Sequence, residues 1–178
     1  QPLAERLRPH SLDDYIGQKH LVGENGVFRK FIASGSVPSF ILWGPPGVGK
    51  TTLAKIVASA LDRPFYTLSA VTSGVKDVRE VIDKAKNQHL FNARPAFLFI
   101  DEIHRFNKSQ QDSLLGAVEQ GIVTLIGATT ENPSFEVISP LLSRCQVYVL
   151  KPMDDSELQT LLDRALETDP ELKSRQIE

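Results

Sequence analysis

The sequence predicts an α/β domain in which a five-stranded parallel sheet lies between two layers of helices. The first observation is that short apolar runs alternate with segments whose apolar residues recur at helical spacing. Such alternation is typical of parallel sheets joined by right-handed helical crossovers. The second observation is a glycine-rich stretch at residues 44–52, which lies between the first apolar run and a helical segment. In sheets of this kind, ligands bind at the carboxyl ends of the strands.

The composition is that of an ordinary globular domain. The chain has 178 residues and a formal net charge of −2, with 41% hydrophobic and 24% charged residues. It therefore lacks the overall basicity that would indicate nucleic-acid binding. The single cysteine, Cys145, excludes an internal disulfide, and no Cys/His spacing predicts a metal site. A reducing cytosolic or nuclear setting fits, and no apolar run approaches the ~20 residues of a membrane span.

The N-terminal part precedes the sheet. Ser11 is predicted to cap a helical turn that carries Tyr15 and Ile16. This turn either packs on the core as an arm or forms a wall against an adenine base. Apolar residues at helical spacing then predict a helix over 26–34, which Gly35 ends.

The core elements follow from apolar patterning. Strands are predicted where several apolar residues run together, and helices where apolar residues recur every three or four positions. Boundaries come from Pro95 before the third strand, Gly121 after a helix and Pro152 after the fifth strand. The expected elements are strand 40–43, helix 50–61, strand 64–68, helix 77–87, strand 96–100, helix 108–120, strand 122–128, strand 146–150 and helix 154–167.

Residues 44–51 fit the pattern Gly-x-x-x-x-Gly-Lys-Thr between a strand and a helix, which predicts a phosphate-binding loop. Glycines let backbone N–H groups face an anion, and the N-terminus of the next helix adds its positive end. We expect Lys50 to reach the β- and γ-phosphates and Thr51 to ligate Mg²⁺. The predicted nucleotide-binding residues of the loop are Gly44, Pro45, Pro46, Gly47, Val48, Gly49, Lys50, Thr51 and Thr52.

Polar residues also follow two other predicted strands. Asp101 ends an unbroken apolar run, where its carboxylate can hold Mg²⁺ through water opposite Thr51. Glu102, one residue further, can orient and polarise an attacking water. After the fourth strand, Thr130 is expected to hydrogen-bond the γ-phosphate or that water, and the neighbouring Thr129 is the alternative.

Other residues leave alternatives open. Arg144, just before the last strand, is either an arginine finger for a neighbouring subunit or an ordinary surface arginine. Ser69, at the end of the second strand, either holds Glu102 in an inactive pose or caps the strand. The mixed-charge segment 102–112 faces either solvent or a nucleic-acid strand.

Together, the glycine loop, the acid pair, the two threonines and residues 143–145 resemble an AAA+ ATPase of the clamp-loader branch, which has a P-loop NTPase αβα core. The strings at 101–112 and 127–135 resemble a narrower family, the replication-associated recombination ATPases. This family comprises bacterial RarA, also called MgsA, and the eukaryotic Werner-helicase-interacting ATPase. Residues 69–76 resemble its bacterial members in particular.

The resemblance implies an AAA+ core at residues 1–151 and the start of a helical lid at 152–178, so the chain is expected to be a fragment without the family's second sensor arginine. It implies that ATP and Mg²⁺ bind and that Arg144 is the trans arginine finger. The residues that fall at the family's adenine contacts are Leu7, Arg8, Pro9, Tyr15 and Ile16.

The same resemblance implies partners and a location. The expected partners are DNA with single-stranded, gapped or forked ends, single-stranded-DNA-binding protein and further copies of the chain. No membrane partner is expected, and the expected location is the bacterial cytosol at the nucleoid.

We hypothesise that the protein is an ATPase, stimulated by DNA in its full-length form, which remodels DNA or DNA–protein complexes at stalled replication forks and DNA ends. In this hypothesis the catalytic residues are Lys50, Glu102, Thr130 and Arg144 of a neighbour. One alternative is a clamp-loader or Holliday-junction branch-migration subunit. The other is a nucleotide-gated repair scaffold with little turnover.

Overall fold

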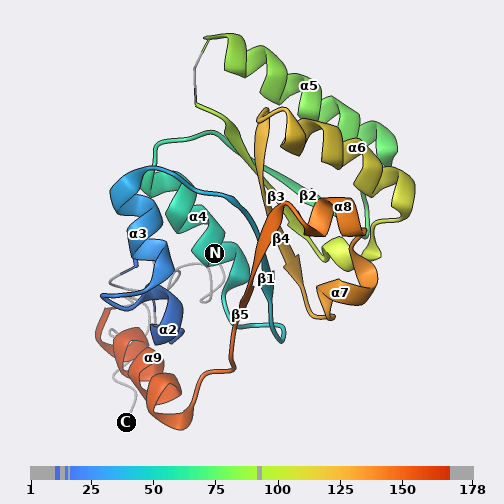
Figure 1. The fold of residues 1–178 in the computed structure, drawn as a ribbon. Coiled ribbons are helices and arrows are strands. Elements are labelled where there is room, and N and C mark those ends of the chain that lie inside the picture. The colour runs from blue at the N-terminus through green and yellow to red at the C-terminus, as the bar shows by residue number, and fades with distance from the viewer. Residues whose placement is uncertain (1–10, 13–14, 16, 92–93, 169–178) are drawn as a thin grey trace.

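The computed structural model describes residues 11–12, 15, 17–91 and 94–168 of the chain. Five parallel strands form one sheet in the order β2-β3-β4-β1-β5, with helices on both faces (Figure 1). The predicted three-layer fold with a five-stranded parallel sheet is therefore confirmed. The strands are β1 (Ser39–Trp43), β2 (Phe65–Ser69), β3 (Ala96–Asp101), β4 (Val123–Thr129) and β5 (Cys145–Val149).

Strand β1 lies inside the sheet, between β4 and β5. Its residues Phe40, Ile41 and Leu42 are completely buried, as expected for a strand that is covered on both faces. Strands β2 and β5 form the two edges and are only partly buried. Since all pairings are parallel, the carboxyl ends of the five strands lie together at one end of the sheet, which we call its carboxyl edge, and the amino ends lie at the opposite, amino edge.

Two hydrophobic cores fill the space between the sheet and its helices. In β3, Phe97 and Phe99 join the core on the side of α3 and α4. Leu98 and Ile100 point the other way and join the core on the side of α5 and α6, because successive strand side chains alternate between faces. These four helices are α3 (Val27–Ser34), α4 (Lys50–Ala60), α5 (Val75–Phe91) and α6 (Lys108–Glu119).

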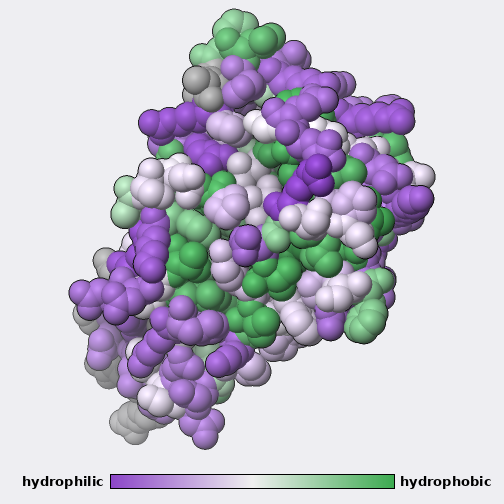
Figure 2. All heavy atoms as spheres, viewed as in Figure 1, coloured by the Kyte–Doolittle hydropathy of each residue, from purple (hydrophilic) through white to green (hydrophobic). Residues whose placement is uncertain are grey.

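Helix α5 extends beyond the predicted 77–87 at both ends. The prediction followed buried apolar positions, and the C-terminal turn of α5 has none, so the predicted helix ended too early. Leu90 and Phe91 on that turn are 81% and 91% exposed, and hydrophobic atoms gather at this end of α5 (Figure 2). Within the described ranges, no helix combines the length and the apolar content needed to cross a bilayer.

Four short helical segments were not predicted: α2 (Lys19–Val22), η1 (Ile103–Arg105), α7 (Pro133–Glu136) and α8 (Ser139–Leu142). Each has only three or four residues, which is too short for a helical period to show. The mixed-charge segment 102–112 contains η1 and the first residues of α6, which begins at Lys108 as predicted. Ile103 and Phe106 of this segment are buried, which ties it to the core beneath the acid pair.

Helix α9 (Asp155–Thr168) agrees closely with the predicted 154–167. Its leucine face is largely exposed, however: Leu158, Leu162 and Leu166 are 45%, 58% and 44% accessible. Ala165 is buried. The predicted domain boundary at residue 151 falls in the connection between β5 and α9, and the lid itself stays a prediction.

Candidate active site

The glycine loop connects the carboxyl end of β1 to the N-terminus of α4 (Figure 1). Gly47 and Gly49 have φ angles of 81° and 90°, in the left-handed region that favours glycine. Lys50 is the first residue of α4, and its ammonium donates hydrogen bonds to the carbonyl oxygens of Gly44, at 2.7 Å, and Pro45, at 3.0 Å. The loop therefore leads into the positive end of α4, and the binding of phosphate there stays a prediction.

Two glycines of the loop are also required by close packing. A Cβ atom on Gly44 would lie 2.7 Å from the carbonyl oxygen of Leu150, just after β5. A Cβ atom on Gly49 would lie 2.7 Å from the hydroxyl oxygen of Tyr15. Neither position can hold a larger side chain without moving its neighbour.

Tyr15 fixes the loop from behind. Its hydroxyl donates to the carbonyl oxygen of Val48 at 2.7 Å and lies 3.2 Å from that of Gly49. Burial raises the pKa of Tyr15 to about 12, so the hydroxyl keeps its proton and remains a donor at neutral pH. The predicted arm therefore packs on the loop, and the adenine contact of Tyr15 stays a prediction. Leu7, Arg8, Pro9 and Ile16, which were assigned to the same contact, lie outside the described residues.

The acid pair stands at the carboxyl end of β3. Asp101 is the last residue of the strand and pairs in register with Ser69 of β2. Glu102 adopts a left-handed backbone with φ 54° and ψ 46°, which is uncommon for a residue other than glycine. The single turn η1 then brings Nε of Arg105 to 3.3 Å from Oε2 of Glu102, and this ion pair is partly exposed.

Charge couples the loop to the acid pair. Burial lowers the pKa of Lys50, and the carboxylates of Asp101 and Glu102 oppose that effect. The ammonium is thus partly desolvated and is also stabilised by two nearby negative charges. A magnesium-bound phosphate chain, which is itself anionic, fits between such groups when the metal offsets the carboxylates.

These groups surround one cavity of about 410 Å³ at the carboxyl edge of the sheet. Residues predicted from three separate parts of the sequence meet here. The lining residues are Pro46, Gly47, Gly49, Lys50, Thr51, Thr52, Asp101, Glu102, Thr129 and Thr130. The Thr51 hydroxyl and the Asp101 carboxylate supply the hard oxygen donors that suit Mg²⁺, so the residues present fit this ion.

The two threonines at the end of β4 differ in their surroundings. The Thr129 hydroxyl is buried, lies 2.9 Å from Nδ1 of His104 and accepts a hydrogen bond from the backbone N–H of Glu131 at 2.9 Å. Thr130 is exposed and lines the cavity. The geometry therefore favours Thr130 for contact with a ligand and gives Thr129 the task of holding His104.

Arg144 does not reach this cavity. It precedes the amino end of β5, whereas the glycine loop follows the carboxyl end of the parallel strand β1. Its guanidinium lies 3.2 Å from the carboxylate of Glu119 and donates to the carbonyl oxygen of Pro140 at 3.0 Å. Any action of Arg144 on a nucleotide must therefore be on the site of another subunit.

The sequence analysis did not predict the contacts that three residues near the site make. Arg105 pairs with Glu102, and the three-residue spacing of opposite charges could have indicated this contact. His104 bonds to Thr129, which lies 25 positions away. Gln18 donates to the carbonyl oxygen of Lys151 at 2.5 Å and accepts from its N–H at 2.9 Å, across 133 positions. No local signal could have revealed the last two.

The chain is similar to known ATPases in both sequence and structure. Residues 40–153 match the model of the ATPase family associated with various cellular activities (AAA). The chain is 54% identical over 166 residues to replication-associated recombination protein A of Haemophilus influenzae, which covers 93% of this chain and 37% of that protein. It is 54% identical over 176 residues to ATPase WRNIP1 of Dictyostelium discoideum, which covers 99% of this chain and 20% of that protein.

A similar match exists to replication-associated recombination protein A of Escherichia coli K12, with 51% identity over 167 residues, 94% of this chain and 37% of that protein. The chain thus spans little more than a third of the bacterial relatives. Among solved structures, the Thermotoga maritima RuvB Holliday junction branch migration motor superposes with a TM-score of 0.74 at 34% identity, over 90% of this chain and 54% of that one. The chain therefore belongs to the AAA family of ATPases, in the branch of replication-associated recombination protein A and WRNIP1.

Proposed function

We propose that this chain is the ATP-hydrolysing core of a DNA replication, repair and recombination factor that acts at stalled replication forks and DNA ends. One observation carries the proposal: the glycine loop, the acid pair and the β4 threonines line a single cavity at the carboxyl edge of the sheet. The names of the relatives support the DNA context, because several of them are named for replication-associated recombination.

In the proposed reaction, backbone N–H groups of the loop and the N-terminus of α4 bind the phosphates of ATP, and Lys50 neutralises part of their charge. Thr51 and Asp101 hold Mg²⁺. When bound, the ion neutralises charge on the phosphate oxygens. Glu102 leaves its pairing with Arg105 and orients the attacking water, while Thr130 hydrogen-bonds the γ-phosphate or that water.

Further properties of the whole protein are part of this proposal. The helix α9 begins a lid, and subunits assemble so that Arg144 of one reaches the cavity of the next. DNA and single-stranded-DNA-binding protein are the proposed partners, and the nucleoid of the bacterial cytosol is the proposed location. Hydrolysis changes the lid and subunit geometry, and with it the grip on DNA.

The proposal as a whole is tested by phosphate release from the intact protein with and without single-stranded DNA ends. We expect turnover that DNA raises several-fold, and none in Lys50→Ala, because the variant lacks the ammonium that faces the phosphates. Equal rates with and without DNA would contradict the DNA role. Undiminished turnover in Lys50→Ala would contradict the site.

The role of Glu102 is tested by Glu102→Gln. The amide cannot accept a proton from water, so we expect ATP to bind with unchanged affinity and hydrolysis to slow by about a hundredfold or more. Affinity is measured by calorimetry and the rate by phosphate release. The matched control is Glu136→Gln, an exposed position on α7, for which we expect no change. A Glu102→Gln protein that no longer binds ATP would show that the residue has another role.

The role of Arg144 is tested by mixing subunits. Arg144→Ala alone should bind ATP normally and turn over about a thousandfold more slowly, as for other arginine fingers. Adding Lys50→Ala subunits should restore activity, since their Arg144 faces intact cavities. Glu119→Gln removes the ion pair of Arg144 but not the arginine, and we expect this control to stay active. No recovery in the mixture would rule out action between subunits.

The contact of Tyr15 with the loop is tested by Tyr15→Phe. Loss of one buried hydrogen bond to a loop carbonyl should weaken ATP binding about fivefold, which corresponds to about 1 kcal/mol. The control is Tyr66→Phe, which removes the hydrogen bond from Tyr66 to Gln88 away from the loop. This control should lower the melting temperature and leave the ATP affinity unchanged. Equal ATP affinities in wild type and Tyr15→Phe would show that Tyr15 does not position the loop.

A second candidate function is supported by the structural similarity to the RuvB branch migration motor. A subunit of that kind, or a clamp loader, shares the fold and most of the cavity residues. The two functions differ in the DNA that stimulates hydrolysis. Stimulation by four-way junctions alone, or a requirement for a sliding clamp, would favour this second candidate over the first.

A further inference from the structure

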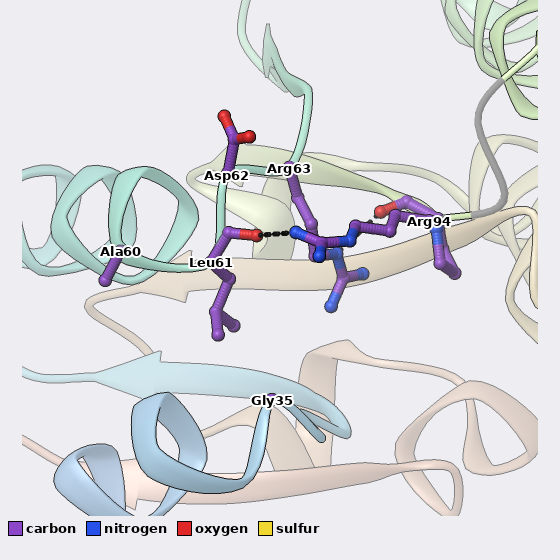
Figure 3. A pocket seen from close by; sticks show the side chains of 7 residues that line it. Gly35, Ala60, Leu61, Asp62, Arg63 and Arg94 are labelled. Atoms are coloured by element: carbon purple, nitrogen blue, oxygen red, sulfur yellow. Dashed lines mark hydrogen bonds between the residues drawn. The ribbon is translucent and has the colours of Figure 1, made fainter.

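A second cavity, of about 380 Å³, lies at the opposite edge of the sheet (Figure 3). Its lining includes Gly35, Arg63 and Pro95, which come just before β1, β2 and β3 respectively. Because the strands are parallel, these residues mark the amino edge, whereas the glycine loop marks the carboxyl edge. The cavity is therefore separate from the ATPase site.

The turn between α4 and β2 determines which charged side chains face this cavity. Asp62 has a left-handed backbone with φ 51°, which aspartate tolerates better than most residues. The N–H groups of Asp62 and Arg63 donate back to the carbonyl oxygens of Ser59 and Ala58, at 3.1 and 3.2 Å, and so reverse the chain. In Figure 3 the carboxylate of Asp62 points away from the arginines, while Arg63 and Arg94 extend toward each other.

Arg63 is held rigidly. Its guanidinium carbon lies 3.8 Å from the centre of the Phe97 ring. Nε donates to the carbonyl oxygen of Pro95 at 2.6 Å, and Nη2 donates to the Thr124 hydroxyl at 2.5 Å. These bonds use two of the five N–H donors of a guanidinium, so the group is fixed in position with donors to spare.

Arg94 completes a pair of positive charges. Its Nη1 donates to the carbonyl oxygen of Leu61 at 2.9 Å, which draws the side chain across the cavity (Figure 3). Burial lowers the pKa of Arg63 to about 10, and the nearby charge of Arg94 adds to this effect. Two neighbouring cations in a partly dry hollow repel each other, and an anion bound between them removes that repulsion.

We propose that the cavity between Arg63 and Arg94 binds a backbone phosphate of a nucleic-acid strand. Arginine presents a planar fork of donors that matches phosphate oxygens, and phosphate contacts make up most protein–DNA hydrogen bonds. A phosphodiester group, which carries one negative charge, matches the paired cations. The inference rests on the proposed DNA role, and it places one DNA contact at the sheet edge that lies away from the nucleotide.

The test is Arg94→Gln in the intact protein. Arg94 is exposed, whereas Arg63 is half-buried and packs on the Phe97 ring, so its replacement would disturb the core. Binding of a labelled single-stranded oligonucleotide is measured by fluorescence anisotropy over a range of KCl concentrations. We expect affinity to fall about tenfold at low salt, and the slope of log K against log salt to shrink by about 0.7, as for one lost phosphate contact. Arg94→Lys keeps the charge and should recover part of the affinity.

The control is Lys84→Gln, which removes one exposed positive charge from α5 away from the cavity and should leave the slope unchanged. Basal ATP hydrolysis should be normal in all three variants, which verifies folding. If the wild type binds no DNA, the proposed function and this inference both fail. If the wild type binds DNA and Arg94→Gln matches it in affinity and slope, only the inference fails.

Inorganic phosphate separates the two sources of the anion. A melting-temperature rise with phosphate that Arg94→Gln abolishes, together with unchanged DNA binding, would assign the cavity to a small phosphate ligand and overturn the nucleic-acid assignment. We expect millimolar phosphate to change the melting temperature of wild type and Arg94→Gln by the same amount. Only the affinity for DNA should differ between the two proteins.

Discussion

The parallel alignment of the strands is the constraint on which the rest of the structure depends. Hydrogen bonding of β1 between β4 and β5, and of β3 beside β4, brings strand ends that are distant in sequence to one line. Three of the five strands deliver polar groups to the cavity there: the glycine loop follows β1, the acids lie at the end of β3 and the threonines at the end of β4. The cavity exists because these ends coincide, and a different strand order would scatter the same residues.

Packing around the glycine loop connects it to the segments that precede and follow the sheet. Gly44 touches Leu150, and the next residue, Lys151, has both of its backbone groups bonded to Gln18. Tyr15, three positions before Gln18, supports the other end of the loop. The segment before the sheet and the segment after it therefore both contact the glycine loop or each other. We expect a shift of the loop to move the connection to α9.

The two edges of the sheet have different chemistry. The carboxyl edge combines one lysine with two carboxylates and hydroxyl groups, which suits a metal-bound phosphate chain. The amino edge carries Arg63, Arg94 and, before β5, Arg144. An arginine at that edge is too far from the carboxyl edge to contact a nucleotide bound by its own chain. Its ligand must therefore belong to another subunit or be a different molecule.

The sequence alone was enough to predict the sheet and the cavity, because both follow from local patterns. Apolar runs located the five strands to within one or two residues, and the glycine pattern located the loop. Contacts between distant segments could not be predicted, as for Gln18 with Lys151 and His104 with Thr129. The exposed leucines of α9 show the limit of periodicity, since an apolar stripe predicts a helix but not whether another element covers it.

The most direct test of the central claim is calorimetric titration of magnesium-ATP into the wild type and Lys50→Ala. If the strand ends converge on a metal-bound triphosphate, the variant should bind about tenfold to a hundredfold more weakly, as expected for a lost charge-assisted contact. Equal affinities would mean that the nucleotide does not occupy this edge of the sheet, and would contradict the claim that the strand ends form its binding site.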